Sequence, residues 1–154
     1  MRIKIAPDQA EKLRRALNEG GRREIGGQLF GEQLAPSEFL VTDLVVQARR
    51  GTYARFFVDL FQAARDAMRF FDSTCHNYTR HNYIGEWHSH PSFEVRPSVT
   101  DLTTMRELVR DPDFKGTFAV LMIVRLDTDR IVAAAWNFDP MGREGIAQLE
   151  IEND

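Results

Sequence analysis

Residues 85–102 read GEWHSHPSFEVRPSVTDL, and two histidines in this stretch, His88 and His90, stand two positions apart. Because alternate side chains of a strand point to the same face, both imidazoles can face one ion from the end of a strand. Pro91 ends the strand, since proline has no N–H to donate to a neighbouring strand. Asp101 comes eleven residues after His90, in the first turn of a predicted helix, where the loop can fold it back toward the imidazoles. The spacing therefore predicts a cluster of three metal ligands.

The ligand types in this cluster favour zinc and a catalytic role. Two neutral imidazole nitrogens and one carboxylate are ligands that zinc accepts in tetrahedral sites. Structural zinc sites are usually closed by four protein ligands, whereas catalytic sites keep one position for water, whose pKa zinc lowers to about 7. The set of His88, His90 and Asp101 therefore predicts a hydrolytic zinc centre.

Hydrolysis at such a centre also needs a group that transfers a proton, and the sequence offers several carboxylates. Glu24, in the segment EIGGQLFG (residues 24–31), is our candidate, although Glu86 and Glu94 lie closer to the histidines along the chain. Glu86 shares strand parity with the two histidines, so it could be a fourth ligand, which would close the site and abolish catalysis. The other interpretations of Glu86 are a supporting role behind the ligands and a position facing solvent.

The segment Ser98-Val99-Thr100-Asp101 has a second interpretation, because it is also a helix-capping sequence. Ser98 would be the N-cap, and Asp101, three residues on, would complete a capping box. Judged alone, this segment favours the capping interpretation, and a lone His-x-His is more often unliganded than liganded. The two interpretations can coexist, but a capping Asp101 would have less freedom to bind a metal.

Outward from this stretch, hydrophobic patterning predicts strands and helices that alternate along the chain. Strands are expected at Arg2–Ile5, Glu24–Leu34, Phe39–Gln47, Arg55–Val58, Tyr83–His88, Phe118–Arg125 and Arg130–Phe138, the last two as a hairpin. Helices are expected at Asp8–Asn18, preceded by Pro7 and ended by Gly20–Gly21, at Leu60–Tyr78 and at Ser98–Arg110. The stretch from Met141 is expected to fray. This order of elements predicts an α/β fold in which a mixed β-sheet is flanked by helices.

Composition restricts the classes of function. The chain has 154 residues, about one domain's worth, so residues 1–154 are expected to form a single domain. A net charge of −3 and a pI of about 5.8 exclude the basic field that would recruit nucleic acid or an anionic membrane. The lone cysteine, Cys75, excludes an internal disulfide framework and a multi-cysteine zinc cluster. Without an apolar run long enough to cross a membrane or a secretory signal pattern, the expected location is the cytoplasm.

Taken together, these motifs resemble those of the JAB/JAMM metalloproteases, also called the MPN-plus family. The segment His88-Ser89-His90-Pro91, six further residues and Ser98-x-x-Asp101 match every defined position, and Glu24, Gly27, Leu29 and Gly31 match the family's upstream strand E-x-x-G-x-L-x-G. The resemblance implies a JAB/MPN fold, which is similar to that of cytidine deaminases. It also implies that His88, His90 and Asp101 bind zinc, that Glu24 is the general base, and that Ser98 helps to stabilise the tetrahedral oxyanion.

The chain further resembles prokaryotic JAB proteins associated with ubiquitin-like conjugation systems. This implies a zinc isopeptidase or peptidase that cleaves the amide bond after the C-terminal glycine of a ubiquitin-like protein, alongside E1- and E2-like enzymes. Two other classes stay open: a non-enzymatic JAB/MPN protein-binding module, against which the complete motif argues, and a DNA-repair-associated JAB-like protein, whose usual loop differs from the one here. A zinc nucleoside deaminase needs a P-C-x-x-C ligand pair, which one cysteine cannot supply.

Overall fold

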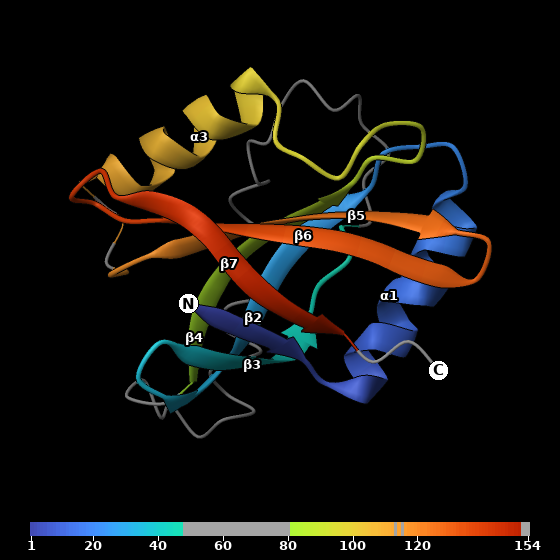
Figure 1. Cartoon of the computed structure of the whole chain (residues 1–154), viewed down its shortest axis with the longest axis horizontal. Coiled ribbons are helices and arrows are strands. Elements are labelled where there is room, and N and C mark those ends of the chain that lie inside the picture. The colour runs from blue at the N-terminus through green and yellow to red at the C-terminus, as the bar shows by residue number, and fades with distance from the viewer. Residues whose placement is uncertain (48–80, 113, 115, 152–154) are drawn as a thin grey trace.

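The computed structural model describes residues 1–47, 81–112, 114 and 116–151. Within these residues it forms seven strands and two helices (Figure 1). In chain order these are β1 (Arg2–Ile5), α1 (Pro7–Gly20), β2 (Gly26–Ala35), β3 (Glu38–Leu44), β4 (His81–Ser89), α3 (Val99–Arg110), β5 (Ala119–Asp127), β6 (Arg130–Phe138) and β7 (Glu144–Ile151). The expected elements at Arg55–Val58 and Leu60–Tyr78, which include Cys75, lie outside the described residues.

The strands form a closed barrel in the order β1-β3-β2-β4-β5-β6-β7, with β7 returning to β1. The sheet is mixed, as expected: β1 pairs in parallel with β3 and β7, β4 pairs in parallel with β5, and the other pairs are antiparallel. The predicted α/β fold, a mixed sheet flanked by helices, did not include the closure of the sheet into a barrel. No helix among the described residues is long and apolar enough to cross a membrane.

The stretch from Met141 closes the barrel, so the expectation that it frays was wrong. β7 follows β6 through a tight turn at Gly142 and pairs with it antiparallel, then pairs in parallel with β1 over Gln148–Ile151. Its sequence, EGIAQLEI, contains few residues with a strong preference for strands. Two neighbouring strands that supply hydrogen bonds explain why it is nevertheless extended.

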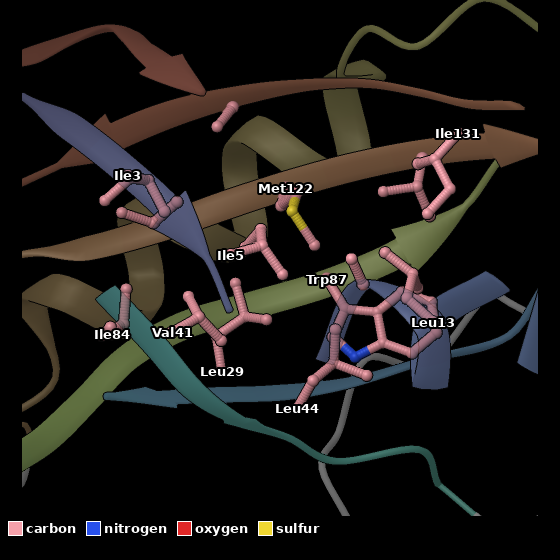
Figure 2. Close-up of a cluster of buried hydrophobic side chains, with 14 of the residues drawn as sticks. Ile3, Ile5, Leu13, Leu29, Val41, Leu44, Ile84, Trp87, Met122 and Ile131 are labelled. Atoms are coloured by element: carbon pink, nitrogen blue, oxygen red, sulfur yellow. The ribbon is translucent and has the colours of Figure 1, made fainter. Parts of the chain in front are cut away.

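The barrel interior is the main core. Figure 2 shows apolar side chains from β1, β2, β3 and β5 converging with Trp87 of β4. Trp87 is fully buried, and its indole N–H donates to the Val45 carbonyl at 2.8 Å. Gly27 lies against the same carbonyl, where a Cβ would overlap the Val45 oxygen. The motif glycine at this position is therefore required by a close backbone approach.

The helices pack on different parts of the barrel. α1 adds Leu13 and Leu17 to the interior cluster, and Gly21, with φ of 57°, ends it where expected. α3 lies outside the barrel (Figure 1), where its Met105 and Val109 pack with Leu121, Ile123 and Phe138 from β5 and β6. Because Leu121 and Ile123 are the register partners of Glu86 and His88 on β4, α3 covers the same outer face that carries these two polar residues.

Candidate metal centre

The two histidines lie together at the end of β4, on the face opposite Trp87. Their Nε2 atoms are 3.1 Å apart, and both side chains are buried. The strand direction continues past the formal end of β4, since the His90 N–H donates to the Val124 carbonyl of β5 at 2.8 Å. The strand geometry therefore brings His88 and His90 to one point, as their spacing predicted.

Asp101 reaches the same point from the first turn of α3. Its Oδ2 lies 3.7 Å from His88 Nε2, and its side chain is buried. The capping interpretation is also confirmed: the Ser98 N–H donates to Asp101 Oδ2 at 2.7 Å, and the Asp101 N–H donates to Ser98 Oγ at 3.1 Å. The two interpretations coexist, because the hydrogen bonds that begin the helix also hold the carboxylate beside the imidazole.

The separations among these atoms fit a tetrahedral metal ion. One ligand atom from each of the three side chains lies within 4.8 Å of the others. Ligand atoms about 2.0–2.2 Å from a tetrahedral ion are about 3.3–3.6 Å apart, and the two measured separations, 3.1 and 3.7 Å, lie close to that range. His88, His90 and Asp101 could therefore hold a metal ion with little rearrangement.

The surroundings of the two imidazoles are suited to ligation. His90 Nδ1 lies 2.9 Å from the Glu94 carbonyl, which can only accept, so Nδ1 is the donor in that bond and Nε2 is turned toward His88. Burial lowers the pKa of His88 to about 4, against the opposing effect of Asp101, with His90 lowering it further. His88 is therefore neutral at pH 7, as metal binding requires.

Glu24 lies beside this cluster although it is far from it in sequence. The Ile25 N–H donates to Ser89 Oγ at 2.9 Å, and the Ser89 N–H donates to the Ile25 carbonyl at 2.8 Å, which joins the start of β2 to the end of β4. Partial burial raises the pKa of Glu24 above its usual value, His90 lowers it and Asp101 raises it. The carboxyl is thus within electrostatic reach of both ligands, with a pKa moved toward that of a general base.

Glu86 lies behind the ligands and belongs to a different cluster. It is buried, which rules out the interpretation that it faces solvent. Its two oxygens accept hydrogen bonds from the Tyr83 hydroxyl at 2.8 Å and from Gln28 Nε2 at 3.3 Å, and burial raises its pKa to about 8. Among the described residues it is not part of the group that could hold a metal. The third carboxylate, Glu94, is exposed and pairs with Arg96.

Sequence reasoning missed the partners of Glu86. The register of β2 and β4 shifts between Leu29↔Gly85 and Phe30↔Tyr83, which makes Ile84 an extra residue in β4. This β-bulge puts Ile84 with Trp87 in the interior and Tyr83 with Glu86 outside. A simple alternation along the strand therefore gives the wrong face for Tyr83, and no local pattern signals the bulge.

Ser98 is exposed at the rim of the cluster. Its Oγ accepts the Asp101 N–H through a lone pair, so its own hydroxyl hydrogen is not used in that bond. Capping and donation to a substrate oxygen are therefore compatible functions of one hydroxyl. Two apolar side chains, Phe93 and Val99, are also exposed beside the ligands, at 65% and 81%.

Several solved structures share this fold at low sequence identity. A solution structure of a protein from Desulfitobacterium hafniense has a TM-score of 0.69 and 17% identity, covering 99% of this chain and 94% of that one. A solution structure from Salinibacter ruber has a TM-score of 0.56 and 20% identity, covering 97% and 92%. The crystal structure of a JAB1/MPN domain protein from Archaeoglobus fulgidus has a TM-score of 0.50 and 16% identity, covering 99% and 100%. The sequence matches none of the curated proteins.

The family is established by sequence over most of the chain. Residues 7–139 match the family model described as prokaryotic homologs of the JAB domain. This range includes the potential ligands His88, His90 and Asp101 as well as Glu24 and Ser98, and the solved structures agree in fold. With its buried His-His-Asp cluster and its JAB/MPN-like barrel, the chain belongs to the prokaryotic homologues of the JAB domain.

Proposed function

We propose that this protein is a zinc-dependent isopeptidase or peptidase that hydrolyses the amide bond following the C-terminal glycine of a ubiquitin-like protein. The observation that carries the proposal is the buried group of His88, His90 and Asp101, with Glu24 brought beside it from the segment that precedes β2. The JAB domain family includes metalloproteases. The complete set of residues supports an enzyme over a non-enzymatic binding module.

Zinc is the metal that this donor set suits. Two imidazole nitrogens and one carboxylate are common ligands of catalytic zinc, and three protein ligands leave a position for water. Strand β4 offers no carboxylate as a fourth ligand, since both oxygens of Glu86 accept hydrogen bonds elsewhere. When bound, zinc supplies Lewis acidity, which acidifies water and polarises an amide carbonyl.

The chain's own side chains supply the proton transfers and the charge stabilisation. Glu24 takes a proton from the attacking water and later gives it to the leaving amine, a task helped by its raised pKa. Ser98 donates its hydroxyl hydrogen to the oxygen of the tetrahedral intermediate while its Oγ still caps α3. Asp101 is already oriented by the Ser98 N–H, so its position does not depend on the metal.

The substrate proposal rests on the resemblance to prokaryotic JAB proteins of ubiquitin-like systems. A glycine-ended tail has no large side chains and fits a narrow approach to buried ligands. The exposed Phe93 and Val99 beside the site offer apolar contact to a protein substrate. We propose E1- and E2-like enzymes as partners and the cytoplasm as the location. Nucleic acid and membranes are not proposed as partners, because the net charge is −3.

A cleavage assay with matched variants tests this function. Ubiquitin-like proteins ending in glycine, fused to a reporter, are incubated with the purified protein, and the products are located by mass spectrometry. We expect cleavage after the glycine, loss of cleavage with a chelator, recovery with zinc, and no cleavage by Glu24→Gln. Stoichiometric zinc without hydrolysis of any such fusion, together with retained binding of the fusion, would instead favour the binding module.

A further inference from the structure

Ser89 stands between the two histidines but does not belong to the metal cluster. Because strand neighbours point to opposite faces, its side chain faces away from His88 and His90, and among the described residues it is outside the ligand group. It is nevertheless almost fully buried. A buried serine hydroxyl at this position therefore serves something other than metal ligation.

That hydroxyl holds the residue next to Glu24. Besides the backbone bond from the Ser89 N–H to the Ile25 carbonyl, the Ile25 N–H donates to Ser89 Oγ at 2.9 Å. Regular pairing of β2 with β4 begins one residue later, at Gly26↔His88. The hydroxyl therefore replaces a backbone acceptor at the point where the ladder has ended. The Ile25 nitrogen belongs to the peptide unit that carries the Glu24 carbonyl, so this bond fixes the orientation of that unit.

The chain before Glu24 is anchored to the end of α1. Residues 21–23 are exposed, but Arg23 bonds the Gly20 carbonyl through its backbone N–H and its side chain, and the Glu19 carbonyl through its side chain. The bond at Ile25 is what ties the peptide unit of Glu24 to the strand that carries the two histidines. Since proton transfer depends on sub-ångström placement of the base, this anchor matters for turnover.

We propose that Ser89 is a positioning residue that holds Glu24 in place through the Ile25 N–H. One tripeptide, His88-Ser89-His90, then carries two of the three ligands and also orients the general base. The inference rests on the proposed role of Glu24. It assigns to the hydroxyl an effect on turnover that is separate from metal binding.

The first variant removes the hydroxyl, and the second restores it. Ser89→Ala loses the acceptor for the Ile25 N–H, whereas Ser89→Thr keeps it. Ser89 lines a pocket of about 50 Å³ with Leu17, Gly21, Pro91, Arg125 and Leu126, so there is space beside this position for the additional methyl of threonine. Ser92→Ala, which removes an exposed serine from the adjoining loop, is the matched control.

The readout that does not depend on activity is amide exchange at Ile25. In the metal-free wild type, the Ile25 amide should exchange as slowly as amides within the β2–β4 ladder. In Ser89→Ala it should exchange at least about tenfold faster, and in Ser89→Thr close to the wild-type rate. Wild-type exchange at Ile25 as fast as at the exposed Arg22 would overturn the proposal even if Ser89→Ala failed to fold.

The kinetic readout separates positioning from ligation. In Ser89→Ala, zinc affinity should stay within about threefold of wild type while kcat falls at least about tenfold with little change in KM. Ser89→Thr and Ser92→Ala should turn over at rates near wild type. On a Glu24→Gln background, Ser89→Ala should cause no further loss, because the two changes remove one function. Loss of zinc by Ser89→Ala, or losses that multiply with Glu24→Gln, would overturn the proposal.

These measurements also distinguish failure of the inference from failure of the proposed function. An active Glu24→Gln enzyme would refute the role of Glu24 whatever Ser89 does. Full activity of Ser89→Ala beside an inactive Glu24→Gln would leave the general base in place and refute only the positioning by Ser89.

Discussion

Two polar clusters lie two positions apart on the outer face of β4, and their buried groups are satisfied in different ways. In the Glu86 cluster, other side chains hold the carboxyl: the Tyr83 hydroxyl and the Gln28 amide N–H both donate to it. The carboxyl oxygens point to partners inside the cluster, and burial raises the pKa of Glu86 to about 8, so it stays neutral.

In the candidate metal centre, by contrast, backbone groups orient two of the three side chains. His90 is oriented by the Glu94 carbonyl, and Asp101 by the Ser98 N–H. The atoms that remain, including the Nε2 atoms of His88 and His90, converge on a shared point. The difference teaches that a buried polar cluster is available to a ligand when its orienting bonds come from the backbone, and is closed when its side chains bond only to each other.

Removing the convergent nitrogens should have the largest effect. The double change of His88→Ala and His90→Ala takes away two of three ligands, so the zinc content of the purified protein should fall to background. Glu86→Gln alters the closed cluster and should keep one zinc per chain. Metal analysis after dialysis gives the result, and stoichiometric zinc in the double variant would mean that the metal binds elsewhere.

The next largest effect should separate the carboxyl groups of Glu24 and Glu86 by function. Glu24→Gln should keep zinc and lose about 10²–10⁴-fold in turnover, the usual contribution of general acid–base catalysis. Glu86→Gln, an isosteric change in the closed cluster, should keep most activity. Steady-state kinetics on a glycine-ended fusion compare them. Equal losses in the two variants would remove the functional distinction between the clusters.

Ser98 should show a smaller effect, because it combines capping with catalysis. Ser98→Ala should cost about 0.5–2 kcal/mol of stability, whereas Ser98→Asn should keep the cap and melt near wild type. We expect Ser98→Asn to cleave at least about tenfold more slowly, with kcat and kcat/KM falling together, as for loss of an oxyanion donor. If Ser98→Asn binds one zinc and keeps the wild-type kcat, Ser98 acts only as the N-cap of α3.

A further expected effect is on the pH dependence of stability, and its sign differs between the clusters. The pKa of Glu86 is raised to about 8, so the folded state keeps a proton that the unfolded state releases, and this stability is lost as pH rises from about 4.3 toward 8. The pKa of His88 is lowered to about 4, so stability is lost instead as pH falls from about 6.5 toward 4.

Glu86→Gln isolates the first of these contributions. In the metal-free protein, the Tm of this variant relative to wild type should increase between about pH 5 and 8, by about 2–4 °C for each kcal/mol that wild type loses. Thermal denaturation across that range measures it. A Tm difference that does not change with pH would contradict a neutral Glu86 in the folded protein.

The candidate ligand cluster and most of the elements could be predicted from the sequence because their signals are local. The spacing of His88, His90 and Asp101, the capping residues of α3 and the hairpin of β5 with β6 depend on strand and helix periodicity over a few residues. Residue patterns alone did not select Glu24 over Glu86, because that choice depends on the register between β2 and β4, and the family resemblance had to supply it.

The features that could not be predicted depend on pairing between distant segments. Barrel closure arises where β7 pairs with β1 at the opposite end of the chain, and the position of Tyr83 arises from the bulge at Ile84. Neither has a signature in its own residues. β7 is extended because β6 and β1 both form hydrogen bonds with it. The bulge exists because the register between β2 and β4 shifts by one residue.

The shared hydrogen bond at the start of α3 has an evolutionary consequence. Asp101 accepts the Ser98 N–H through Oδ2, and an asparagine could accept it through its amide oxygen. Asp101→Asn would thus preserve the helix start while removing the negative charge that attracts a cation. A single nucleotide change at one codon can therefore separate folding from the proposed metal binding. Variants that lose this charge can keep their stability, and selection on stability alone would not remove them.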